Sequence, residues 1–244
     1  MQARTREYII KMSKVKVEEP VVDHTIQPKV NSWEDRLKDS ELFVRSNTRL
    51  LSIVGGGVLG LIVLFFAYTF LYMAPRAKEA AGQMFKAEAY FEADSLTKAV
   101  NGDGNNPGFE SIINDYGNTP SANLARYYLG SVYLRQGDYQ KAIDQLEKYG
   151  AKDDLSGSEA QGMIGDAYSE LKNYDQALSY YLKAADNKPN IFTTPMYLQK
   201  AGLVYEYQKD YTKALDTYTR IKKDYSASSQ SRDIDKFIAR VQQH

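Results

Sequence analysis

Three stretches of this chain repeat one pattern of small and aromatic residues, and this repetition limits the fold more than any other feature. In each stretch a glycine is followed three residues later by a tyrosine and twelve residues later by an alanine. The alanines, Ala142, Ala177 and Ala214, are spaced by 35 and 37 residues. A pattern recurring in phase at this period predicts stacked copies of one small helical unit, each burying its apolar face against the next.

The residue types in the pattern have a physical explanation in helix packing. A glycine in the middle of a helix costs about 1 kcal/mol relative to alanine, so we expect a second helix to cross each glycine too closely for a side chain. The alanines allow the same approach from the crossing helix, and the tyrosines are expected to fill the gap between the two helices. The predicted packing residues are Gly130, Tyr133 and Ala142; Gly165, Tyr168 and Ala177; and Gly202, Tyr205 and Ala214.

The period and these residues resemble the tetratricopeptide repeat (TPR) family over roughly residues 122 to 226. The resemblance implies an all-α fold, a TPR solenoid of paired helices with about three clear repeats. A degenerate fourth unit is expected before them, with a helix from Met84 to Val100 and a short partner helix carrying Phe109 and Tyr116. A last helix is expected to cap the apolar end of the array, and its apolar residues are Ile234, Phe237, Ile238 and Val241.

Residues 51–73 carry no charge across 23 positions. At about 1.5 Å per residue this stretch spans roughly 34 Å of helix, enough to cross a hydrocarbon core of about 30 Å. A cleaved signal peptide is the competing interpretation, but its apolar part is usually shorter and is not preceded by a long polar segment. We therefore predict a mostly disordered tail over 1–49, containing a short helix from Ser32 to Asn47, a transmembrane signal-anchor helix over 50–73 and a TPR domain over 74–244.

Two details of the N-terminal half stay open in the sequence. Gly56 and Gly60 form a G-x-x-x-G pair, which would allow a second membrane helix to approach closely, although glycine is also common in membrane helices. Both Met1 and Met12 could begin the chain.

Composition excludes several kinds of chemistry. Lys and Arg total 31 and Asp and Glu total 31, interspersed along the chain, so no nucleic-acid partner is indicated. The chain has no Cys and two His, His24 and His244, both near chain ends, so a metal site or a His- or Cys-based catalytic centre is not expected. The loop from Asn101 to Gly108 has partial EF-hand spacing but lacks the bidentate ligand. We predict no enzyme activity, no cofactor and no small-molecule substrate.

The TPR resemblance also implies where partners would bind. In such a solenoid the first helix of each pair lines a concave face that takes an extended or helical peptide. Carried onto this sequence, the family's groove positions are Leu124, Tyr127, Ser131, Leu134 and Arg135 in the first repeat, Glu159, Asp166, Ser169 and Glu170 in the second, and Met196, Gln199, Leu203, Glu206 and Tyr207 in the third.

The complete layout resembles the bacterial ancillary subunit of the SecYEG translocon, in its Bacteroidetes-type form. The segment from Phe85 to Gly117, with the phrases AEAYFEADS and NGDGN, carries the resemblance. It implies a single-pass inner-membrane protein with a cytoplasmic N-terminus, a periplasmic TPR domain, and translocon subunits or periplasmic chaperones as partners. The alternative is a structural, self-assembling protein of the envelope or the division machinery.

Overall fold

The computed structural model describes residues 33–244, so residues 1–32 of the predicted tail and the choice between Met1 and Met12 lie outside the described part. By its internal contacts the chain divides into two units, Met1–Ile62 and Val63–His244. The first unit contains α2 (Trp33–Ser46), close to the short helix expected there, and the beginning of α3 (Thr48–Ala67). The described residues are helices and connecting turns, without a strand.

A single helix runs without a break from Thr48 to Glu92. It consists of α3, a π-helical segment η1 (Tyr68–Met73) and α4 (Ala74–Glu92). Its apolar window has a mean hydropathy of 2.5 and none of that window is buried, so by length and composition it could cross a membrane. The expected boundary after residue 73 is therefore not a break in the helix, because the chain continues as α4.

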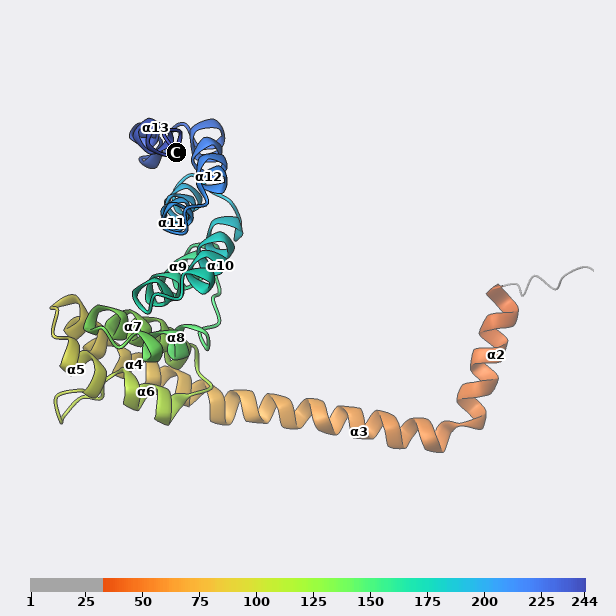
Figure 1. The fold of residues 1–244 in the computed structure, drawn as a ribbon. Coiled ribbons are helices and arrows are strands. Elements are labelled where there is room, and N and C mark those ends of the chain that lie inside the picture. The colour runs from red at the N-terminus through yellow and green to blue at the C-terminus, as the bar shows by residue number, and fades with distance from the viewer. Residues whose placement is uncertain (1–32) are drawn as a thin grey trace, which may run out of the picture. The chain divides into compact units, whose positions relative to one another are not determined.

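The second unit is built of paired antiparallel helices, each pair packing on the next (Figure 1). After α4 come ten short elements: α5 (Leu96–Asn101), α6 (Phe109–Tyr116), α7 (Pro120–Gln136), α8 (Tyr139–Leu146), α9 (Asp154–Glu170), α10 (Tyr174–Asp186), α11 (Thr193–Tyr207), α12 (Tyr211–Asp224), η2 (Gln230–Arg232) and α13 (Ile234–Val241). The first helices of the pairs are α4, α7, α9 and α11, and the expected capping helix is α13, which packs on α12.

The same turn ends all four first helices. One residue adopts a positive φ in each turn, and the N–H of the following residue donates to the carbonyl oxygen of a tyrosine five residues earlier. This bonding satisfies carbonyl groups that the helix end would otherwise leave unpaired. The positive-φ residues are Asp94, Gly137, Lys172 and Lys209, and the tyrosines are Tyr90, Tyr133, Tyr168 and Tyr205.

This turn corrects the predicted helix from Met84 to Val100. The helix stops at Glu92, Asp94 turns the chain at φ 56°, and a new helix starts at Leu96. Sequence reasoning missed the break because Asp94 takes the place that Gly137 has in the next repeat, and an aspartate is a weaker sign of left-handed backbone than a glycine.

The second helix of the degenerate unit, which precedes the three clear repeats, is split in two. Ala99 lies nine residues after Tyr90, as Ala142 lies nine after Tyr133, and both alanines are fully buried. The chain then leaves the helix for a loop in which the Asp103 carboxylate accepts hydrogen bonds from the Asn106 N–H and from the Tyr90 hydroxyl. Helix α6 resumes the packing against α4 and α7. The aspartate of the partial EF-hand pattern thus holds the loop closed.

Candidate functional site

The repeat glycines lie where a second helix crosses the first. A Cβ atom built on Gly130 would be 2.5 Å from the Leu146 side chain, and one on Gly202 would be 2.3 Å from the Tyr218 ring. The corresponding atom on Gly165 would be 2.7 Å from the Tyr181 ring. The predicted alanines Ala142, Ala177 and Ala214 are all fully buried.

The side chains above these glycines differ from the predicted ones. Leu146, Tyr181 and Tyr218 occupy the crossings, each four residues after the repeat alanine on the second helix. The predicted tyrosines pack beside the crossings: Tyr133 is buried and donates to Glu110, Tyr168 stacks on the Tyr180 ring, and Tyr205 is half-buried. The predicted arrangement overlooked that side chains on the second helix also point toward the glycine.

An open cleft of about 260 Å³ lies on the second and third repeats. Leu203 and Tyr207 from α11 contribute exposed apolar surface, with the Leu203 side chain 44% exposed. Tyr174, at the start of α10, packs against Tyr207 with the two rings tilted by 40° and their centroids 4.2 Å apart. The full lining is Ser169, Tyr174, Tyr181, Lys200, Leu203, Val204 and Tyr207.

An ion pair lies beside this cleft. The Lys200 ammonium is 2.6 Å and 2.8 Å from the two carboxylate oxygens of Asp166, and the Tyr181 hydroxyl donates to the same carboxylate at 2.7 Å. The lysine also lies over the rings of Tyr181 and Tyr197. Burial, together with the Asp166 charge, raises the pKa of the Tyr181 hydroxyl, so this group remains a proton donor.

The pairing changes what the predicted acidic groups can do. Asp166 and Glu170 are both predicted groove residues, but Lys200 compensates the charge of Asp166. Glu170 is exposed and accepts a hydrogen bond from the neutral Tyr139 hydroxyl, 3.4 Å away, so its charge is available at the surface.

The remaining predicted groove residues mainly connect helices. Tyr127 is half-buried and donates to Glu159 at 2.7 Å, which joins α7 to α9. Arg135 pairs with Asp94, and Glu206 binds Arg240 of α13 and the Tyr218 hydroxyl. Leu124 is exposed. Four more predicted groove residues are half-buried, namely Ser131, Leu134, Met196 and Gln199. Of the predicted set, the cleft brings together Ser169, Leu203 and Tyr207.

Sequence reasoning missed Lys200, Tyr174 and the pair formed by Gly162 and Tyr197. Lys200 lies 34 residues after Asp166, so opposite charges one repeat apart were the available signal. Tyr197 crosses α9 directly above Gly162, where a Cβ atom would be 2.0 Å from the ring. Gly162 precedes Gly165 by three residues on the same helix face, which was a second readable signal.

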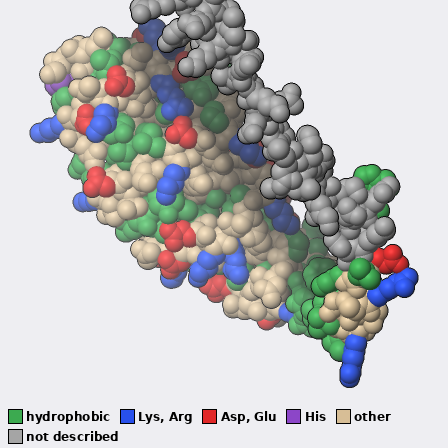
Figure 2. Space-filling view, turned by 90° about the vertical axis from the view of Figure 1, so that its right-hand side faces the viewer, with side chains coloured by type: hydrophobic (Ala, Val, Ile, Leu, Met, Phe, Trp, Pro, Cys, Tyr) green, Lys and Arg blue, Asp and Glu red, His purple; other side chains and the backbone are tan. Residues whose placement is uncertain are grey.

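Figure 2 shows acidic and basic side chains interspersed with apolar ones on the face of the molecule that it draws. Among residues 33–244, no three His, Asp or Glu side chains are grouped in a way that could hold a metal ion. Gly56 and Gly60 have open space around them in the described part of the chain, so their contact with another helix stays a prediction.

Comparison with known proteins agrees with the repeat fold. Residues 121–190 match one tetratricopeptide repeat model and residues 197–228 match another. The uncharacterised protein ycf37 of Guillardia theta is 34% identical over 102 residues, which are 40% of this chain and 55% of that protein. This chain therefore spans little more than half of that relative.

Solved structures share the fold at low sequence identity. A tetratricopeptide repeat protein from Parabacteroides merdae superposes with a TM-score of 0.55 at 18% identity, covering 68% of this chain and 61% of that one. TPR-like repeats related to a kinesin light chain from Podosopora anserina give a TM-score of 0.50 at 14% identity, covering 68% and 86%. These likenesses concern the fold alone. Residues 121–190 and 197–228 of this chain match the tetratricopeptide repeat, and they form part of an all-α helical solenoid.

Proposed function

We propose that this protein is a membrane-tethered scaffold whose cleft on the second and third repeats holds an apolar side chain of a protein partner. The observation that carries the proposal is the unbroken helix from Thr48 to Glu92, because its apolar part has the length of a membrane span and its last part is the first helix of the solenoid. Nothing but helix separates the tether from the binding domain.

The cleft supports the choice of an apolar anchor. Leu203 and Tyr207 are exposed, while the charges beside them are satisfied within the protein by the Lys200–Asp166 pair. Exposed apolar and aromatic surface next to paired charges is typical of the centre of a protein interface, where a few buried anchors supply most of the affinity.

The cellular part of the proposal follows from the layout. We place the tail in the cytoplasm and the repeats in the periplasm of a bacterial inner membrane, with translocon subunits or periplasmic chaperones as partners. The resemblance to the ancillary SecYEG subunit and the absence of Cys support this placement. Protease added to spheroplasts should digest the repeats; full protection of residues 74–244 would refute the orientation.

A photo-crosslinking residue at Leu203 tests the partner. Leu171 is a matched control, because it is also an exposed leucine at 45% but does not line the cleft. In intact cells we expect Leu203 to give adducts with membrane-bound translocon subunits or with chaperones, and Leu171 to give few. Adducts of the chain with itself or with cell-wall enzymes would favour the structural alternative, and equal adducts at both positions would show that the cleft is not the binding site.

A further inference from the structure

The loop between α10 and α11 exposes two large apolar side chains. Phe192 is 77% exposed and Ile191 is 41% exposed. Leu155, in the first turn of α9, is 52% exposed as well. Single exposed apolar residues are common on soluble proteins, but three in neighbouring turns indicate a contact with something apolar.

The loop is built to hold these side chains outward. The Asn190 side chain accepts hydrogen bonds from the N–H groups of Phe192 and Thr193, both at 2.9 Å, and donates to the Thr193 hydroxyl at 2.7 Å. The Thr194 hydroxyl donates to the carbonyl of Ala185 at 2.9 Å, which ties the loop to α10. A loop with its polar groups satisfied in this way has little freedom to fold the phenylalanine inward.

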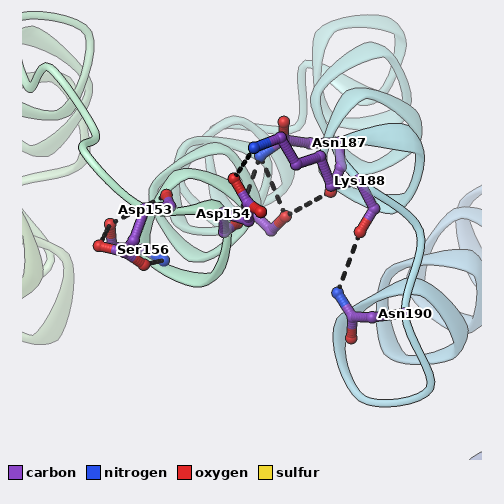
Figure 3. Close-up of polar contacts among 7 residues, drawn as sticks. Asp153, Asp154, Ser156, Asn187, Lys188 and Asn190 are labelled. Carbon is purple, nitrogen blue, oxygen red and sulfur yellow. Dashed lines mark hydrogen bonds and ion pairs between the residues drawn. The ribbon is translucent and has the colours of Figure 1, made fainter.

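The same loop is fastened to the beginning of α9. Lys188 pairs with the Asp154 carboxylate, and the Asn187 side chain contacts the Asp154 carbonyl and the Ser158 hydroxyl (Figure 3). Because Leu155 follows Asp154, these bonds bring it to the same side of the solenoid as the loop. We call Leu155, Ile191 and Phe192 the apolar edge patch.

This patch lies on the edge of the solenoid where the first helices begin. At that edge Arg76, at the start of α4, donates to the Asp115 carbonyl at the end of α6. Asn123, at the start of α7, exchanges two hydrogen bonds of 2.8 Å with the Gly150 backbone, which precedes α9. The contacts of Asp154 continue the series to the start of α11.

The apolar helix also joins the solenoid at this edge, because α4 begins there directly after η1. If the preceding apolar helix lies in a bilayer, the start of α4 lies at the bilayer surface. The start of α11, next to the patch, is three helix spacings from the start of α4, which is about 25–30 Å at ordinary helix spacing. If this edge of the solenoid lies flat on the bilayer, the patch is displaced along the bilayer surface and stays in contact with it.

We propose that the apolar edge patch contacts the lipid bilayer and holds this edge of the solenoid against the membrane surface. Aromatic side chains favour the boundary between headgroups and acyl chains. Arg76 at the same edge donates to a neutral carbonyl, so its positive charge suits anionic headgroups. The inference rests on the proposed membrane span.

Tryptophan fluorescence in defined vesicles tests the contact. The full chain contains one Trp, so a Trp33→Phe background accepts single reporters at Phe192, Leu61 and Leu171. Leu61 reports the membrane span, and Leu171 is the control, because it lies at the other end of α9 from Leu155. The protein is reconstituted without partners in phosphatidylcholine–phosphatidylglycerol vesicles whose acyl chains carry bromine, a quencher.

We expect strong quenching for Leu61→Trp, clear quenching with a blue-shifted emission for Phe192→Trp, and neither effect for Leu171→Trp. If the Leu61 reporter is quenched but the Phe192 reporter, like the Leu171 reporter, is not, the edge contact is overturned and the membrane span is not. An unquenched Leu61 reporter would overturn the span, and the edge contact with it. A second variant, Ile191→Ser combined with Phe192→Ser, should make the Leu155→Trp reporter lose at least half of its quenching; unchanged quenching there would also count against the proposal.

Discussion

Replacing Gly162 by alanine adds a single methyl group at the point where α11 crosses α9. A Cβ atom there would lie 2.0 Å, 2.2 Å and 2.4 Å from the Cε1, Cζ and hydroxyl atoms of Tyr197. Carbon atoms in contact are about 3.5–4.0 Å apart, so the ring would have to move by roughly 1.5 Å. Tyr197 is almost fully buried, so its ring has no free space to enter.

The expected loss of stability follows from two opposing effects. Alanine is favoured over glycine within a helix by about 1 kcal/mol, whereas forcing an extra group into a packed core costs about 1–3 kcal/mol and occasionally more. Because the obstacle is a held ring, we expect Gly162→Ala to lower the free energy of unfolding by about 1–2 kcal/mol. The control is Gly82→Ala on α4, where nothing lies within 4 Å of the new atom, and which should gain up to about 1 kcal/mol.

The assay is denaturant unfolding of the full chain in detergent, followed by far-ultraviolet circular dichroism. A Tyr197→Leu background supplies the second test, since in it the alanine should become neutral or stabilising. If Gly162→Ala and Gly82→Ala stabilise the protein equally, the close crossing of α9 and α11 does not exist and the reasoning fails.

Two further substitutions test the turn and the cap. Lys172→Gly relieves a left-handed residue at φ 58° and should raise the free energy of unfolding by up to about 1 kcal/mol in the same assay; a lower value would contradict the account of the turn. Burial raises the pKa of Glu206, but hydrogen bonds from Arg240 and Tyr218 outweigh it and hold the pKa below its usual value. The stabilisation by Glu206 is therefore complete above about pH 4.5 and is lost as the pH falls below it. Glu206→Gln should make the melting temperature less dependent on pH over that acidic range, and an unchanged dependence would count against the role of this carboxylate.

The repeats were predictable because each one contains the same pattern of packing residues. Gly165 and Ala177 mean little alone, but with equivalents one period earlier and later they define a helix crossing. The fold class and the repeat units followed from this redundancy, and the capping helix followed from the apolar residues that come after the third repeat. The degenerate unit before the clear repeats was harder to predict, because its turn uses Asp94 and a loop interrupts its second helix, so that neither signal is repeated elsewhere.

The cleft was less predictable than the fold. The sequence indicates which residues lie on a first helix, but whether Tyr127 faces a partner or the next repeat depends on how far adjacent repeats rotate. In this chain its hydroxyl finds Glu159 across the repeat boundary and the side chain becomes a connector. Leu203 stays available because its neighbours Lys200 and Asp166 satisfy each other. These side-chain pairs depend on distances of a few ångströms between helices, and the spacing of residues along the sequence does not give those distances.

The contacts between neighbouring repeats also determine how the solenoid opens. The hydrogen bonds that join Tyr139 to Glu170, Tyr127 to Glu159 and Lys200 to Asp166 span 31, 32 and 34 residues, about one period. Because these contacts join adjacent repeats, each repeat is stabilised by its two neighbours. Disruption of one boundary between repeats therefore destabilises the adjacent repeats only. Amide hydrogen exchange should therefore be slowest in the central repeat and faster toward α13, where one neighbour is missing. A partner seated between the second and third repeats would slow exchange in those two units and leave the first repeat unchanged.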